Sequence, residues 1–235
     1  MTKQSKIKLP SIEYIVITYP KNHHICYSIL ETWGVSKKIL FLSDIDGGSN
    51  IRNFGGDIGY KNIYTKYIGL FKNYTPKSDW IVFCDDDSFI LEKNLIDFLK
   101  YISPELNICV GKIGELSQSG LDAKGKRTGF PYKSLSGKNI SLPLLYPSGG
   151  AGFVISNNTF KLIKEMIYDD PETAFNSDVA MGFWLRRVGA SLLHNSKFNH
   201  THPELLDHSD DTIRQSISYH YIKNHYQIYK RLRDG

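Results

Sequence analysis

The stretch that decides the fold is Trp80-Ile81-Val82-Phe83-Cys84-Asp85-Asp86-Asp87, in which five apolar residues are followed at once by three aspartates. A short apolar run that ends in polar residues is typical of a strand buried on both faces. In an open α/β sheet, the residues that follow such a strand lie at the carboxyl edge, where ligands usually bind. The sequence therefore predicts that the sheet presents three carboxylates at its binding edge.

Strand-like apolar runs and stretches with helical spacing alternate on both sides of this segment, which predicts an α/β fold. Strands are expected at 12–18, 39–42, 80–84, 108–110, 142–146 and 153–155, helices at 22–33, 60–74, 91–101, 158–167 and 178–188, and one further element at 212–221. Residues 43–59 and 114–140 are expected to be loops. The second is rich in Gly, Ser and Lys and is predicted to be a functional, mobile flap.

The composition fits a globular chain of 235 residues with 41% hydrophobic residues and a formal net charge of +5. A core of this size needs neither a disulfide framework nor a structural metal. The positive charge is compatible with a phosphate-bearing partner, but the basic residues are scattered, so no nucleic acid is expected. The longest apolar run, Trp80 to Cys84, is far shorter than a membrane span, so an anchor would have to precede Met1.

The three cysteines, Cys26, Cys84 and Cys109, lack the spacing of a metal site. Two of them lie inside strand-like apolar runs, as buried free thiols do. We therefore expect free thiols and no zinc site.

The three aspartates suggest a metal site, because carboxylates this close repel one another and raise one another's pKa unless a cation compensates them. Carboxylate oxygens suit Mg²⁺ or Mn²⁺, which often bridge protein carboxylates to a diphosphate. The alternative is an acidic turn or a solvated helix start, since Asp favours N-cap positions.

Four further features could carry chemistry. Gly149-Gly150-Ala151-Gly152 lets backbone N–H groups approach a ligand, but its spacing is not that of a P-loop, so a tight turn or bulge is the favoured explanation. Asp178 opens a predicted helix, where it is either an N-cap or a carboxylate suited to act as a general base. His200 and His202 could reach a metal or a diphosphate, or could be structural. Trp184 is expected in the core, with contact to a sugar as the weaker alternative.

Six stretches in this order resemble the Fringe-like family of β1,3-glycosyltransferases. The stretches are Glu31-Thr32-Trp33-Gly34, Leu42-Ser43-Asp44, Trp80 to Phe89, Ser148 to Ser156, Ser177 to Gly182, and Asn199-His200-Thr201-His202-Pro203-Glu204. The resemblance extends from about Tyr14 to Tyr219.

The resemblance implies one Rossmann-like GT-A domain at 11–222, with terminal extensions at 1–10 and 223–235. Its central sheet would be mixed, mostly parallel and flanked by helices. The implied activity is transfer of a sugar from a UDP-sugar to a glycan or glycoprotein hydroxyl, with inversion, with Mn²⁺ or Mg²⁺ as cofactor and in β1,3 linkage. The family also implies the Golgi or secretory lumen, with any type II membrane anchor outside this chain.

The resemblance also implies roles for individual residues. Asp178 matches the catalytic base, and Asp87 and His200 match the metal ligands, with His202 as the alternate. The residues that match nucleotide-sugar contacts are Thr18, Ser43, Asp44, Asp85, Asp86, Gly149 and Gly150.

The sequence departs from the family pattern at two positions. Ser177 replaces the first member of a common acidic pair, and a common Arg falls near Ile25, where only His23 and His24 are close. Family members hold conserved disulfides that three cysteines cannot supply. The departures at these two positions suggest one alternative, a relative that binds sugar or protein without turnover. The aspartates suggest a second, a carboxylate-metal phosphotransferase or nuclease, which would need further acidic ligands on neighbouring strands, and the sequence places none there clearly.

Overall fold

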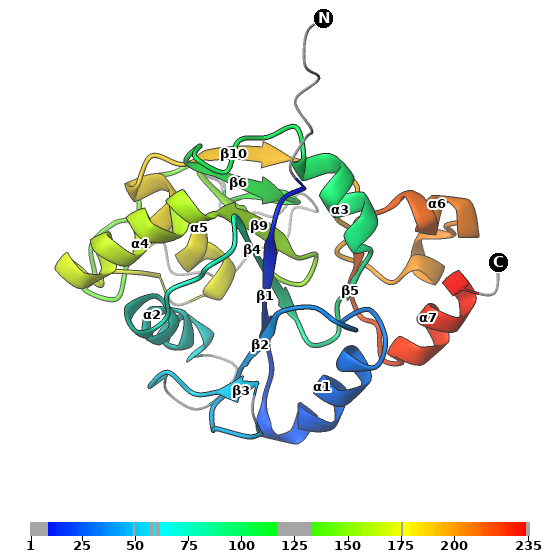
Figure 1. The fold of residues 1–235 in the computed structure, drawn as a ribbon. Helices are drawn as coiled ribbons and strands as arrows, with labels where there is room; N and C mark the ends of the chain where they lie inside the picture. The colour runs from blue at the N-terminus through cyan, green and yellow to red at the C-terminus, as the bar shows by residue number, and fades with distance from the viewer. Residues whose placement is uncertain are drawn as a thin grey trace, which may run out of the picture.

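The computed structural model describes residues 9–48, 50–56, 59, 62–116, 133–174 and 176–233. At its centre lies a seven-stranded sheet with the strand order β10-β6-β9-β4-β1-β2-β3 (Figure 1). The strands are β1 (Ile12–Ile17), β2 (Ile39–Leu42), β3 (Ile51–Arg52), β4 (Trp80–Asp85), β6 (Ile108–Gly111), β9 (Phe153–Ser156) and β10 (Ser191–His194).

Of the strands described in this sheet, only β9 runs antiparallel to its neighbours, β4 and β6. The pairs β4–β1, β1–β2, β2–β3 and β6–β10 are parallel. The predicted mixed, mostly parallel sheet is therefore confirmed. Strands β1 and β4 consist almost entirely of buried residues, as expected where helices cover both faces of a sheet.

Helices cover both faces of the sheet and create two apolar cores (Figure 1). On one face lie α2 (Ile63–Asn73), α4 (Asn157–Asp169) and α5 (Ser177–Arg187), and on the other lie α1 (His23–Leu30), α3 (Glu92–Leu99), α6 (Asp210–Gln215) and α7 (His225–Arg233). Side chains alternate along β1, so Ile15 and Ile17 enter the first core and Tyr14 and Val16 the second. The helix predictions at 60–74, 91–101, 158–167 and 178–188 are confirmed within a few residues at each end.

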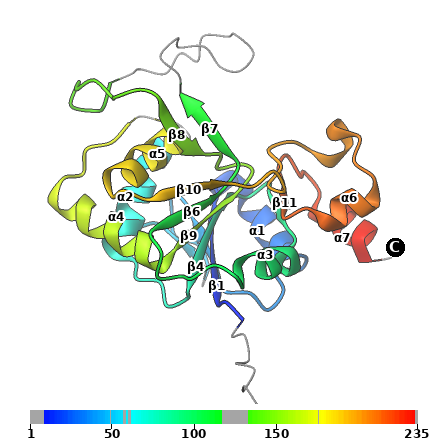
Figure 2. The same ribbon diagram turned by 90° about the horizontal axis from the view of Figure 1, so that it is seen from above.

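Two small antiparallel pairs extend this architecture. Strand β5 (Phe89–Ile90) pairs with β11 (Ser218–Tyr219), and β7 (Ile113–Leu116) pairs with β8 (Leu144–Pro147). Helices α6 and α7 lie together at one end of the molecule, beyond β11 (Figure 2). The β5–β11 pair joins the segment after the three aspartates to the C-terminal part of the chain, across more than a hundred residues of sequence.

Several sequence predictions need correction. The loop expected at 43–59 contains β3, which pairs with β2 in the central sheet. The helix expected at 22–33 is a 3₁₀ turn (Pro20–Asn22) followed by α1, which ends at Leu30. Gly34 then packs so closely on Ile29 that a Cβ atom there would lie 2.7 Å from the Ile29 carbonyl oxygen. The element expected at 212–221 is the helix α6 followed by the strand β11, because Ser209 caps α6 early and the chain is extended again at Ser216.

The predicted loop at 114–140 begins inside β7, which pairs with β8, and residues 117–132 lie outside the described residues. The flap prediction therefore falls largely on residues that the structure does not describe.

The remaining expectations about the core hold. All three cysteines are buried and free. Trp184 is fully buried and donates its indole N–H to the Glu172 carbonyl oxygen at 3.2 Å, so it belongs to the core and does not face a sugar. None of the helices in the described part of the chain combines the length and apolar character needed to cross a membrane.

Candidate functional site

The aspartates lie at the end of β4, at the carboxyl edge of the sheet, as the sequence predicts. Asp85 is the last residue of β4 and is paired in register with Ile17 of β1. The Asp86 N–H continues this pairing by donating to the Ile17 carbonyl oxygen at 2.9 Å. The Asp86 side chain accepts from Thr18 at 2.7 Å and from Asn22 at 3.0 Å, so it points toward the end of β1.

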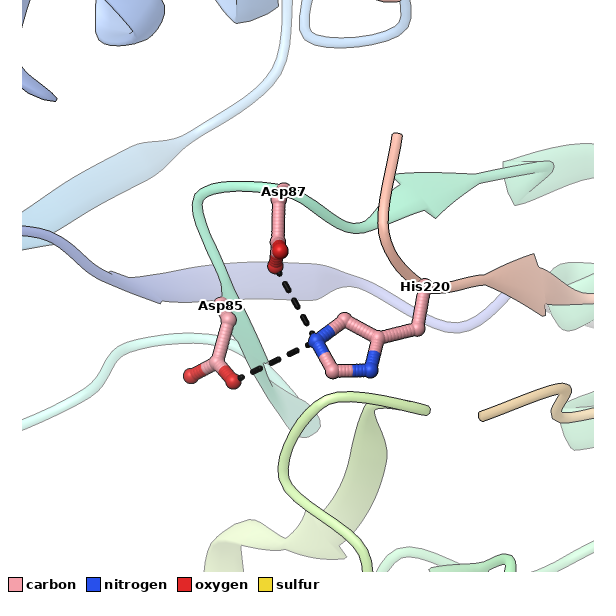
Figure 3. A group of neighbouring side chains, drawn as sticks. All are labelled: Asp85, Asp87 and His220. Carbon is pink, nitrogen blue, oxygen red and sulfur yellow. Dashed lines mark ion pairs between the residues drawn. The ribbon is translucent and has the colours of Figure 1, made fainter. Parts of the chain in front are cut away.

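Asp85 and Asp87 instead come together with a histidine from the C-terminal part of the chain. The His220 Nε2 atom lies 3.1 Å from Asp87 Oδ1 and 3.8 Å from Asp85 Oδ2 (Figure 3). One potential ligand atom from each of the three residues lies within 4.8 Å of the others. Two carboxylate oxygens and one imidazole nitrogen are a ligand set that suits Mn²⁺ or another divalent metal ion that binds oxygen and nitrogen ligands.

The electrostatics of the group favour proton or metal binding. Burial, together with the carboxylates of Asp178 and Asp87, raises the pKa of Asp85 to about 7. Burial lowers the pKa of His220, but the hydrogen bond and charge of Asp87 and the charge of Asp85 outweigh burial, so that the pKa lies above its usual value. Half-buried carboxylates beside an imidazole favour a bound positive charge, and a divalent cation can take the place of the proton.

Two adjacent glycines connect this group to Asp178. A Cβ atom at Gly150 would lie 2.1 Å from His220 Cε1, and a Cβ atom at Gly149 would lie 2.7 Å from Asp178 Oδ1. The Gly149 N–H also donates a hydrogen bond to the Asp178 carboxylate. The segment does form a tight turn, in which the Gly152 N–H donates to the Gly149 carbonyl oxygen at 2.9 Å and Gly152 has φ +78°. The turn accounts for Gly152, whereas close approach to other side chains accounts for Gly149 and Gly150.

The N-cap explanation for Asp178 is wrong, because Asn176 is the N-cap of α5. Its Oδ1 accepts from the N–H of Asp178 at 2.9 Å and from that of Val179 at 3.2 Å. The Asp178 side chain is thus free to face the glycine loop. Burial raises its pKa to about 6, despite the opposing hydrogen bonds from Gly149 and Ser177. A carboxylate with a pKa in this range is suited to accept a proton near neutral pH.

The residues predicted at the nucleotide edge are linked through a buried lysine. The Lys66 Nζ atom lies 2.6 Å from Asp44 Oδ1 and 3.3 Å from the Thr18 carbonyl oxygen, and it sits 4.0 Å from the centre of the Tyr19 ring. Ser43 is bonded to His23 instead, with 2.8 Å between Oγ and Nε2. Thr18, Ser43, Asp44 and Asp86 therefore all lie at the carboxyl ends of β1, β2 and β4.

The structure does not bring the other predicted histidines into the metal group. The His200 side chain is exposed, and its backbone is hydrogen-bonded to the His220 ring. His202 accepts from the Glu204 N–H at 3.2 Å and caps a short 3₁₀ helix, Pro203–Leu206.

Sequence reasoning missed His220 and Lys66. His220 offers no local signal, because it reaches the aspartates only through the pairing of β11 with β5. Lys66 offers one: it is a charged residue on the apolar face of α2, next to the buried Ile63, Tyr67 and Leu70.

Two of the curated proteins that the chain resembles are N-acetylglucosaminyltransferases. The chain is 27% identical over 130 residues to the human N-acetyllactosaminide beta-1,3-N-acetylglucosaminyltransferase 4, covering 52% of this chain and 31% of that protein. The mouse enzyme of the same name is 28% identical over 116 residues, covering 48% and 31%. The chain thus matches about a third of the length of these relatives.

Among solved structures, the fold is similar to that of the galactosyltransferase LgtC in complex with donor and acceptor sugar analogs, with 13% identity, a TM-score of 0.46, and coverage of 94% of this chain and 95% of that chain. It is also similar to the apo form of the bifunctional glycosyltransferase WbbM, with 12% identity, a TM-score of 0.49, and coverage of 92% and 46%. A sequence model described as Fringe-like matches residues 60–232, which include the aspartates, the glycine loop, Asp178 and His220. The chain therefore belongs to the Fringe-like family.

Proposed function

We propose that this chain is a metal-dependent, inverting glycosyltransferase that transfers a sugar from a UDP-sugar to a glycan or glycoprotein hydroxyl, in β1,3 linkage. The observation that supports it best is the arrangement around the glycine loop. Gly150 adjoins the metal-ligand candidate His220, and Gly149 adjoins the base candidate Asp178. A ligand group and a base on either side of one loop are what a single-step sugar transfer needs.

Asp85, Asp87 and His220 would hold the metal ion, with Mn²⁺ as the first candidate and Mg²⁺ as the second. His220 takes the place that the sequence resemblance gives to His200, because its Nε2 atom lies 3.1 Å from Asp87. When bound, the ion would supply positive charge opposite the diphosphate of the donor.

Asp178 would act as the general base and remove the proton of the acceptor hydroxyl as its oxygen attacks the anomeric carbon. Its half-buried position and raised pKa, about 6, support this role. The Gly149 N–H holds the carboxylate in one orientation, so that the proton acceptor is directed before the substrate arrives.

The nucleotide would lie along the ends of β1, β2 and β4, against Thr18, Ser43, Asp44 and Asp86. Lys66 holds this edge in place through its ion pair with Asp44 and its hydrogen bond to the Thr18 carbonyl oxygen. Because the curated relatives are named as N-acetylglucosaminyltransferases, UDP-N-acetylglucosamine is the first donor to test. We also propose, from the family alone, that the protein works in the Golgi or secretory lumen, which a tagged full-length protein imaged in its own cells would test.

Calorimetry with UDP, with and without Mn²⁺, tests the site. We expect UDP binding to require the metal, and Asp87→Ala to abolish that requirement together with most of the affinity. Asp97→Ala is the matched control, because Asp97 is an aspartate that binds Lys93 and Lys100 far from the site. Equal UDP affinity with and without metal in the wild type, or wild-type affinity for UDP and Mn²⁺ in Asp87→Ala, would contradict the proposal.

Turnover separates an enzyme from a protein that only binds. A glycosyltransferase releases UDP slowly from its donor even with water as acceptor, so UDP release from UDP-N-acetylglucosamine and other UDP-sugars should depend on Mn²⁺ and on Asp178. A wild type that binds UDP and Mn²⁺ but releases no UDP from any donor would favour the alternative of a relative without turnover.

A further inference from the structure

The turn that carries the three aspartates is fastened to the C-terminal segment by main-chain hydrogen bonds. The Asp86 carbonyl oxygen lies 2.9 Å from the Nε2 atom of His225, and the Asp87 carbonyl oxygen accepts from the Ile222 N–H at 2.8 Å. Two residues after Asp87, Phe89 is paired with Tyr219 between β5 and β11. The segment that supplies His220 thus also binds the carbonyl groups of Asp86 and Asp87.

Asp86 is the fixed point of this turn. Its side chain is bonded to Thr18 and Asn22, and its N–H is bonded to Ile17 of β1. The carbonyl group of Asp86 and the N–H of Asp87 belong to one planar peptide unit. A hydrogen bond that sets the direction of the Asp86 carbonyl therefore also sets the direction in which the chain enters Asp87, and the donor of that bond is His225.

His225 is a polar side chain at a buried position, where it lowers the stability of the fold unless its nitrogens are hydrogen-bonded. Its side chain is 1% exposed, and its ring stacks on Phe89 with 6.1 Å between the ring centres and 20° between the ring planes. The Nδ1 atom is buried and has no hydrogen-bond partner among the residues that the structure describes. An apolar ring of the same size would pack against Phe89 without leaving a buried nitrogen unpaired. Within the described part of the chain, the imidazole makes one hydrogen bond, which is the bond to the Asp86 carbonyl oxygen.

The same contact fixes the tautomer of the ring. A carbonyl oxygen only accepts, so the Nε2 atom must carry the proton. Burial lowers the pKa of His225, so the ring is neutral and the Nδ1 atom bears the lone pair. The imidazole is therefore a single N–H donor aimed at one peptide group.

We infer that His225 is a positioning residue for the metal group: through the Asp86 carbonyl it fixes the turn so that Asp87 faces Asp85 and His220. This inference rests on the proposed function, because it assigns His225 a part in metal binding. His225 touches neither the ion nor the substrate in this account. It acts by holding two ligands at the separation that coordination requires, as residues behind metal ligands commonly do.

The test compares Mn²⁺ affinity, measured by paramagnetic resonance without nucleotide or donor, in three variants. His225→Phe keeps the ring and the stacking but removes the donor, and it should weaken Mn²⁺ binding about tenfold or more. His225→Gln keeps a donor nitrogen and should recover most of the affinity. Tyr226→Phe is the matched control, because it removes a neighbouring hydrogen bond of α7, to Glu31, that does not involve the turn. It should bind Mn²⁺ as the wild type does.

Melting curves without metal show that the compared proteins are folded. A folded His225→Phe variant that binds Mn²⁺ as tightly as the wild type overturns the inference and leaves the proposed function intact. A folded His225→Gln variant that binds as weakly as His225→Phe overturns it too. A wild type that binds no Mn²⁺, alone or with UDP, overturns the proposed function and this inference together.

A measurement on the wild type alone covers the case in which His225→Phe does not fold. In ¹⁵N-labelled protein, the His225 ring should show the neutral tautomer with the proton on Nε2, and this proton should exchange slowly with water. A ring protonated on Nδ1, or a rapidly exchanging Nε2 proton, would overturn the inference without any variant.

Discussion

Replacing either glycine of the Gly149-Gly150 pair by alanine adds a methyl group directly against a different functional side chain. The Cβ atom of Gly150→Ala would lie 2.1 Å from His220 Cε1 and 2.4 Å from His220 Nδ1. Nonbonded carbon atoms normally stay about 3.5 Å apart, so the imidazole would have to move by about 1.4 Å. The distance between a metal ion and its ligand atom can deviate from its usual value by only about 0.2 Å. His220 can then no longer bind the same ion as Asp85 and Asp87.

The second substitution affects the base candidate and leaves His220 alone. The Cβ atom of Gly149→Ala would lie 2.7 Å from Asp178 Oδ1, and the carboxylate can avoid it only by turning away. We therefore expect Gly150→Ala to lose metal-dependent UDP affinity by at least about tenfold. Gly149→Ala should keep that affinity and lose turnover, by about 100-fold for a displacement near 1 Å.

Calorimetry of UDP with Mn²⁺ and a UDP-release assay, carried out on the same preparations, separate the two effects. Gly189→Ala is the control for destabilisation: Gly189 has φ +67° and no atom near its Cβ position, so alanine there should cost about 1 kcal/mol of stability and change neither readout. Normal Mn²⁺-dependent UDP binding in a folded Gly150→Ala protein would refute the assignment of His220 to the metal group. Normal turnover in Gly149→Ala would refute the assignment of Asp178 as the base.

Three more predictions follow from the site. Asp178→Asn should keep its affinity for UDP and Mn²⁺ while the rate of transfer falls about 100-fold, and a folded Asp178→Asn protein with near-normal transfer would contradict the base role. In the wild type, the rate of transfer should decline on acidification below the Asp178 pKa of about 6. With a chelator present, the melting temperature should fall as the pH rises from about 6 to about 8. The pKa values of Asp85, Asp178 and His220 are raised, so the folded protein binds these protons more tightly than the unfolded chain does. Mn²⁺ should weaken or reverse this trend by competing with protons, and a melting temperature that rises with pH in the chelator would contradict the prediction. Lys66→Met leaves the buried Asp44 charge unpaired and should lower the free energy of unfolding in denaturant by about 3–5 kcal/mol. Adding Asp44→Asn to the same chain should restore part of this free energy. An unchanged free energy of unfolding in Lys66→Met would mean that the pair is not formed.

The sequence alone determined the class of the fold and where its carboxylates lie. The apolar run before Asp85 fixes a buried strand, and the alternation of strands and helices fixes parallel connections. Together they place residues 85–87 at the carboxyl edge of the sheet, because side chains that follow a parallel strand can lie nowhere else. Most element positions followed for the same reason: periodicity is a local property that neighbouring residues carry by themselves.

Local signals could not decide between alternative roles for single residues. Asp178 at a helix start is equally compatible with a cap and with a base, and only the structure shows that Asn176 provides the cap. Gly149 and Gly150 are equally compatible with a turn, and only their close approach to Asp178 and His220 explains why neither carries a side chain. Each of these choices depends on a contact with another part of the chain.

The histidine of the metal group is the clearest case that only the tertiary structure decided. The sequence offers His200 and His202 in a recognisable pair, whereas His220 has no motif around it. His220 faces Asp85 and Asp87 because β11 pairs with β5, which is a long-range event that depends on the packing of α6 and α7 beyond it. Lys66 reaches Asp44 for the same reason, through the packing of α2 against the sheet. Sequence patterns predict which elements form, but the distance between two side chains is set only when those elements pack.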